Sequence, residues 1–175
     1  MTPITLADLW LPILVAGLAT HILSTLAWTV LPHHRSEWSH LEFAPINEAA
    51  NAIGAKPDGQ YVLTDDTESC KDPAKCRGML IYWPHKPNMG ANIGLTLAFF
   101  FAAALTIGYL ATIGLHRETS LVDVFRFTAT AGVLTHVAAG VPHIIWFRRK
   151  SLLDTLDGLA YALATGAAFA WLWPA

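Results

Sequence analysis

The chain has 175 residues, of which 54% are apolar and only 14% charged, and its mean hydropathy is +0.41. These values are typical of integral membrane proteins. The net charge of −2 excludes a basic surface for nucleic acid. The sequence contains none of the common nucleotide-binding or hydrolase motifs, so no catalytic site is evident.

Four long apolar segments predict membrane-spanning helices at about 9–31, 91–115, 124–147 and 155–174. The first has no charged residue between Asp8 and Arg35, and Pro32 ends it because proline cannot donate a helix hydrogen bond. Asn88 is a predicted N-cap for the second. At 1.5 Å per residue, each segment can cross a hydrocarbon core of about 30 Å.

Two of these segments carry small residues at four-residue spacing, which lets helix backbones approach closely in lipid. The residues are Gly90, Gly94, Ala98 and Ala102 in the second segment, and Gly158, Ala162, Gly166 and Ala170 in the fourth. The predicted fold is therefore an all-α membrane protein, a single integral domain (1–175) built as a four-helix bundle.

Residues 32–90 predict a small α+β cap outside the membrane. A short helix follows Pro45 and stops before Gly54, and two short strands follow at 60–64 and 77–83. Cys70 and Cys76 lie between the strands and are candidates for a disulfide, which favours the periplasm. The positive-inside rule instead places 32–90 in the cytoplasm, and this orientation is favoured over the periplasmic one.

Several side chains near the span ends are candidates for contact with lipid. Trp10, Trp28, Trp146 and Trp171 lie where an aromatic belt is expected. Arg126 is three residues after Asp123, with which it can pair on one helix face. Arg126 is predicted to reach the membrane interface, and an anion or lipid headgroup contact is the alternative.

Histidines inside the spans are candidates for binding a cofactor. His21 and His136 lie near the centres of the first and third spans, which run in the same direction, and His143 follows His136 by one heptad. Two imidazoles at similar depth are compatible with haem b held between helices, or with a metal or proton relay. The alternative is a neutral histidine that hydrogen-bonds a neighbouring helix.

The stretch LPHHRSEWSH (31–40) follows the first span and is rich in possible metal ligands. If it continues as a helix, His33, Glu37 and His40 lie on one side and can bind a divalent metal. However, Pro32 marks a break and Arg35 would repel a cation, which favours an interface turn. Acidic residues at the start of the fourth span, at 154 and 157, are explained by the helix dipole.

Several segments together resemble a group of bacterial inner-membrane proteins with four spans and no assigned function. They are LPHHRSEW after the first span, the strand with GQY, PNMG before the second span, and the terminal DGLAYALATGAAFAWLWP. The resemblance covers most of the chain. It implies a multi-pass protein of the inner membrane and implies no activity.

The function that these patterns favour is that of an accessory or structural subunit of a larger membrane complex, not that of an enzyme. Its partners would be the lipid bilayer and other subunits or further copies of this chain. One alternative is a small redox protein that binds haem or metal through its histidines. A second alternative is a small transporter, for which broken helices are expected.

Overall fold

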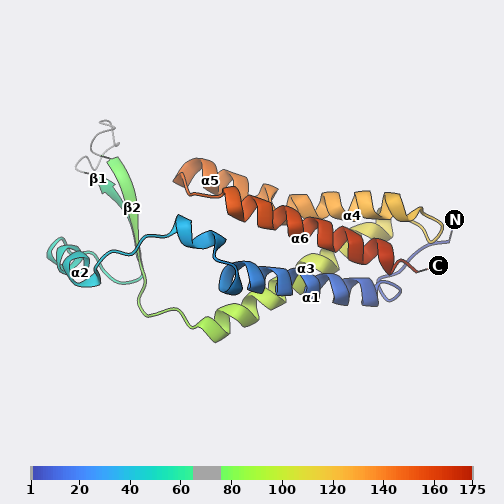
Figure 1. Cartoon of the computed structure of the whole chain (residues 1–175), viewed down its shortest axis with the longest axis horizontal. Helices are drawn as coiled ribbons and strands as arrows, with labels where there is room; N and C mark the ends of the chain where they lie inside the picture. The colour runs from blue at the N-terminus through green and yellow to red at the C-terminus, as the bar shows by residue number, and fades with distance from the viewer. Residues whose placement is uncertain (1, 65–75, 175) are drawn as a thin grey trace. The chain divides into compact units, whose positions relative to one another are not determined.

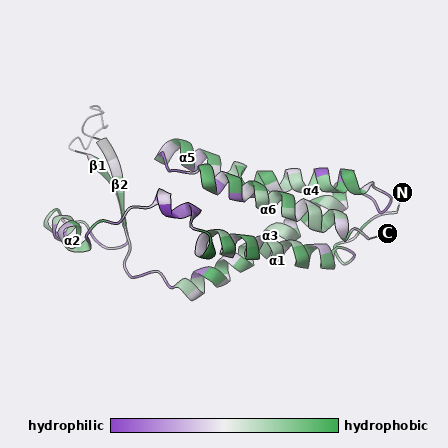
Figure 2. Cartoon of the chain, viewed as in Figure 1, coloured by the Kyte–Doolittle hydropathy of each residue, from purple (hydrophilic) through white to green (hydrophobic). Residues whose placement is uncertain are grey.

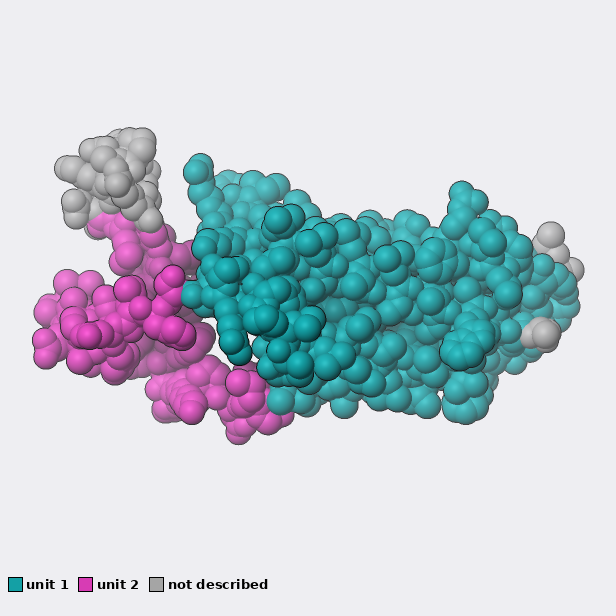
Figure 3. Space-filling model, viewed as in Figure 1, with its two compact units in different colours: residues 1–38, 93–175 teal, residues 39–92 magenta. Residues whose placement is uncertain are grey.

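The computed structural model describes residues 2–64 and 76–174. The chain forms two compact units, residues 1–38 with 93–175 and residues 39–92, coloured teal and magenta in Figure 3. We call them unit 1 and unit 2 and describe each by itself.

Unit 1 is a bundle of long helices, and Figure 1 shows α1, α4 and α6 running side by side, with α3 passing behind them. The α-helices that contribute to it are α1 (Trp10–Thr25), α3 (Met89–Gly114), α4 (Leu121–His136), α5 (Val141–Phe147) and α6 (Leu152–Trp171). A π-helical turn extends α1 from Leu26 to Val30. Asn88 accepts a hydrogen bond from the amide of Ala91 (3.1 Å), which confirms the predicted N-cap.

Three stretches of the described chain are long and apolar enough to cross a membrane: Trp10–Val30, Met89–Gly114 and Leu121–Phe147. Figure 2 shows the apolar residues along these helices. The fourth predicted span forms α6, a helix of 20 residues with Asp154 and Asp157 near its start, but α6 is not among the three. The structure thus supports a helical membrane protein, and the fourth span stays a prediction.

The helix expected at 124–147 is interrupted. It ends as α4 at His136, and a 3-10 turn at Ala138–Gly140 separates it from α5. Pro142 lies in the first turn of α5. Because proline has no amide hydrogen, it cannot bond to the carbonyl four residues earlier, so the α-helical ladder breaks there.

The small residues of α6 allow the close packing that their spacing predicts, and the helix they meet is α4. A Cβ added to Gly132 in α4 would lie 2.9 Å from the Cα of Ala162 in α6, so glycine is required at this crossing. The stripe on α3 does not pack in this way. A Cβ added to Gly94 would have no neighbouring atom within 4 Å, and Ala98 is exposed.

Bulky side chains hold α3 against the other helices of unit 1. The ring of Phe101 on α3 meets Gly17 on α1, and Phe100 is buried. The small-residue stripe of α3 faces outward, so the prediction of close packing through it was wrong within this chain. The core of unit 1 is centred on Leu9, Ile107 and Phe169, each at most 1% exposed.

The first and last described segments of the chain lie at the end of unit 1 that holds the α3–α4 loop. Pro3 forms a β-bridge with His116, and the indole of Trp173 donates to the carbonyl of His116 (3.2 Å). Arg117 forms an ion pair with Asp8 (2.7 Å). The opposite end of the bundle therefore carries the end of α1 and the beginning of α6.

Unit 2 contains α2 (Phe43–Ala52) and an antiparallel hairpin of β1 (Gly59–Thr64) and β2 (Cys76–Tyr82). The predicted helix and two strands are confirmed. The hydroxyl of Tyr82 donates to Asn47, which joins the hairpin to α2. Cys70 lies outside the described residues, as does the side chain of Cys76, so the disulfide stays a prediction.

Candidate metal centre

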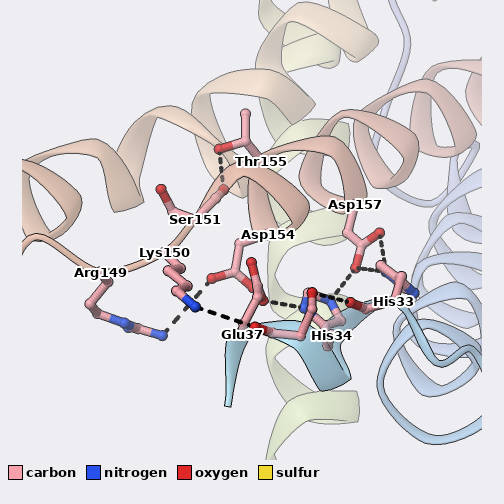
Figure 4. Close-up of polar contacts among 10 residues, drawn as sticks. His33, His34, Glu37, Arg149, Lys150, Ser151, Asp154, Thr155 and Asp157 are labelled. Atoms are coloured by element: carbon pink, nitrogen blue, oxygen red, sulfur yellow. Dashed lines mark hydrogen bonds and ion pairs between the residues drawn. The ribbon is translucent and has the colours of Figure 1, made fainter. Parts of the chain in front are cut away.

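Two elements at one end of unit 1 bring together imidazole and carboxylate groups. The first is a 3-10 helix, His33–Glu37, that follows Pro32. Such a helix has three residues per turn, so His34 and Glu37 lie on the same side. The second element is the beginning of α6, which contributes Asp154 and Asp157. Figure 4 shows these side chains pointing toward one another.

His34 lies between two carboxylates. Its Nε2 is 2.8 Å from Oδ2 of Asp157, and its Nδ1 is 2.6 Å from Oε2 of Glu37. His33 approaches the same aspartate, with Nε2 3.3 Å from each oxygen. Ligand atoms of His33, His34 and Asp157 lie within 4.8 Å of one another, as do those of His34, Glu37 and Asp154. Both sets offer the nitrogen and oxygen ligands that divalent metals bind.

The ring of His34 is fixed from several sides. It stacks on Trp28, with ring centroids 3.9 Å apart and planes inclined by 10°, and it is only 5% exposed. When the ring is neutral, Nδ1–H donating to Glu37 leaves the Nε2 lone pair facing Asp157. Histidines that bind metals are commonly oriented by a carboxylate on the other ring nitrogen in this way.

The electrostatics of the cluster favour a cation. Burial lowers the pKa of His34, but the hydrogen bonds that its ring donates to Glu37 and Asp157, and the negative charges of these carboxylates, outweigh burial, so the pKa is raised. Burial raises the pKa of Asp154, and the charge of Glu37 adds to this effect. Arg149 is the basic neighbour, with Nη2 3.9 Å from Asp154.

The structure does not gather the predicted set His33, Glu37 and His40 at one point, because His33 and Glu37 belong to different ligand groups that share only His34. The helix ends at Glu37 and Trp38 is extended (φ −114°, ψ 131°), so the α-helical register that would align His40 is absent. His40 is exposed and belongs to unit 2. His34 and Asp157 were missed, although the His-His doublet and an acidic residue inside an apolar segment were visible signals.

The histidines near the middle of the candidate spans, His21 and His136, lie among aromatic rings. Phe100 contacts both His21 (centroids 6.3 Å apart) and His136 (5.8 Å), and Tyr161 contacts His136 (6.0 Å). A haem between the two imidazoles would need the space that Phe100 fills. Among the described residues, Nδ1 of His21 is buried without a hydrogen-bond partner. The haem site stays a prediction.

His143 is separated from His136 by the helix interruption. It is exposed on α5, where its ring contacts Phe147 (centroids 5.4 Å apart). Because the 3-10 turn breaks the α-helical repeat, the heptad spacing does not place the two histidines on one continuous helix face.

The residues predicted to contact lipid are exposed and lie near helix ends. They are Trp10, Trp28, Trp146 and Trp171. Arg126 pairs with Asp123 at 3.4 Å, which confirms the predicted pair. Contact of these side chains with lipid stays a prediction.

We compared the chain with protein-family models, with curated proteins and with solved structures, and none of the three comparisons gives a match.

Proposed function

We propose that the protein is a multi-pass membrane protein of the bacterial inner membrane that binds one divalent transition-metal ion through His33, His34 and Asp157. The observation that carries this proposal is the orientation of His34. Glu37 and Trp28 hold its ring so that Nε2 faces the carboxylate of Asp157, to which His33 also points.

The spacing of these atoms suits a small metal ion. Nitrogen and oxygen ligands at about 2.1 Å in tetrahedral positions lie about 3.4 Å apart. Nε2 of His33 lies 3.3 Å from each carboxylate oxygen of Asp157, which is close to this value. The 2.8 Å contact between His34 and Asp157 must lengthen by a few tenths of an ångström to admit the ion. Rotation of one carboxylate is enough for such a change.

The ligand types narrow the choice of metal. Two imidazoles and one carboxylate suit Zn²⁺, Fe²⁺ or Ni²⁺ better than Mg²⁺ or Ca²⁺, which prefer oxygen, or Cu⁺, which prefers sulfur. A set of three protein ligands leaves a position open for water or an exchanging ligand. The site therefore suits an ion that is used or passed on more than one that only holds a fold together.

Equilibrium dialysis against Zn²⁺ tests the proposal. Protein purified without a histidine tag in mild detergent is expected to retain one zinc per chain, by elemental analysis. The Asp157→Asn and His34→Ala variants should lose it. Asp123→Asn is a matched control, because Asp123 also pairs with a basic residue at a helix start. Zinc retained by both site variants, or absent from the native protein, would overturn the proposal.

The role of accessory subunit is a second candidate, favoured by the exposed small-residue stripe on α3. Gly90, Gly94 and Ala98 face outward and leave room for a helix of another protein. Gly94→Leu should then abolish co-purification with a partner from solubilised membranes. Unchanged co-purification, or no partner for the native protein, would refute this role.

A further inference from the structure

We infer that a cavity next to the metal centre binds the headgroup of a phospholipid that carries a primary ammonium, such as phosphatidylethanolamine. The cavity has a volume of about 210 Å³. Its lining consists of Trp28, Glu37, Trp38, Arg149, Lys150 and Asp154. None of the three proposed metal ligands lines the cavity, but Glu37, which contacts His34, belongs to its lining.

The basic side of the cavity suits a phosphate. Arg149 and Lys150 come from the turn before α6, and Figure 4 shows both approaching the acidic pair. Arg149 lies 3.9 Å from Asp154, which is beyond hydrogen-bond distance. Lys150 donates to the backbone carbonyl of Ser36 at 3.3 Å. Both cations therefore keep donors for phosphate oxygens.

The acidic side of the cavity suits an ammonium. Carboxylate oxygens of Glu37 and Asp154 lie within 4.8 Å of each other, and a cation between them relieves their mutual repulsion. Trp28 and Trp38 are 47% and 62% exposed, and an indole face attracts a cation. A primary ammonium can donate hydrogen bonds to both carboxylates, whereas the trimethylammonium of choline cannot.

The total charge and the position of the cavity point to a lipid. The charges of the two carboxylates and the two basic side chains sum to zero. A neutral cavity matches a zwitterionic headgroup better than an anionic one. The cavity lies where α1 ends and where the chain passes from α5 to α6. These are ends of candidate spans, at the level where headgroups are found. The acyl chains would then follow the apolar outer faces of the helices.

Native mass spectrometry with an equimolar mixture of phosphatidylethanolamine, phosphatidylcholine and phosphatidylglycerol tests this inference. We expect the native protein to retain phosphatidylethanolamine in preference to the other two. Arg149→Gln combined with Lys150→Gln should reduce its retention at least tenfold, and Asp154→Asn should reduce the preference over phosphatidylglycerol. The matched control is Lys56→Gln, which removes an exposed cation of unit 2 that lies outside the candidate spans.

Lys150→Gln alone gives a milder test if the double variant does not fold, and it should weaken retention in the same direction. Soluble phosphoethanolamine, which lacks acyl chains, distinguishes a lipid from a free metabolite. The inference would be overturned by equal retention of the three lipids or by equal effects of the cavity variants and Lys56→Gln. Binding of the soluble compound without the lipid would also overturn it.

Discussion

Replacing Glu37 with glutamine changes the charge behind His34 while keeping the shape of the side chain. Glu37 is 2.6 Å from Nδ1 of His34, and both side chains are at most 10% exposed. Glutamine can still accept a hydrogen bond from Nδ1, so the ring orientation should persist. What is lost is the negative charge that makes Nε2 a stronger ligand.

The expected size of the effect follows from this contact. Loss of a carboxylate behind a metal-binding histidine typically lowers metal affinity about 10- to 100-fold. This range corresponds to about 1.4–2.7 kcal/mol of binding free energy. Glu37→Ala should lower metal affinity by the upper end of this range or more, because it removes the hydrogen-bond acceptor as well as the charge.

Competition with a chromophoric zinc chelator measures the affinity of each variant. The Asp123→Asn protein provides the control for loss of a carboxylate. The affinity should decrease in the order native, Glu37→Gln, Glu37→Ala. If Glu37→Gln binds zinc as tightly as the native protein, Glu37 does not tune His34 and the reasoning from its position is refuted.

Further predictions concern pH, packing and the stacked indole. Because the pKa of His34 is raised above its ordinary value of 6.5, its contribution to the stability of the metal-free protein is complete below that value and is lost as pH rises through the folded-state pKa. The unfolding temperature of the metal-free protein in detergent should therefore decline above about pH 6.5, and His34→Gln should abolish this decline. Zinc affinity should rise over the same pH interval, because the proton must leave His34 before the metal binds. An unfolding temperature that does not change with pH would contradict this. Gly132→Ala should destabilise the bundle by about 1–3 kcal/mol, because the added methyl group overpacks the contact with α6. Gly94→Ala should be neutral or should stabilise the bundle by up to about 1 kcal/mol. Equal unfolding temperatures of these two variants would refute the packing described. Trp28→Ala should weaken zinc binding without changing the number of ions bound, and unchanged affinity in the chelator assay would show that stacking does not orient His34.

The positions of the long helices could be predicted because each is a continuous apolar run. The run from 9 to 31 corresponds to α1 with its π-helical turn, and Asn88 correctly marked the beginning of α3. Glycine and alanine at four-residue spacing predicted that α6 packs closely on a neighbouring helix, but the same pattern failed for α3, whose small residues face outward. Spacing shows where close approach is possible, but it does not show which face of a helix meets a neighbour.

The candidate site was harder to predict because it depends on local helix type and on tertiary contact. With 3.6 residues per turn, His33 aligns with Glu37, whereas with three residues per turn His34 does. The sequence prediction used the α-helical value of 3.6 residues per turn, whereas the structure has a 3-10 helix at this place. The acidic residues that begin α6 were attributed to the helix dipole, which suits Asp154 in the first turn, but Asp157 lies beyond that turn. Its proximity to His34 arises only from folding.

The central claim is tested most directly by X-ray absorption spectroscopy at the zinc edge, on tag-free protein loaded with one equivalent of Zn²⁺. The metal centre described here predicts nitrogen and oxygen ligands at about 2.0–2.1 Å with outer-shell scattering from two imidazoles. In the His33→Ala variant, the outer-shell scattering should correspond to one imidazole instead of two. A spectrum without imidazole scattering, or one that is identical in the native protein and this variant, would contradict the account.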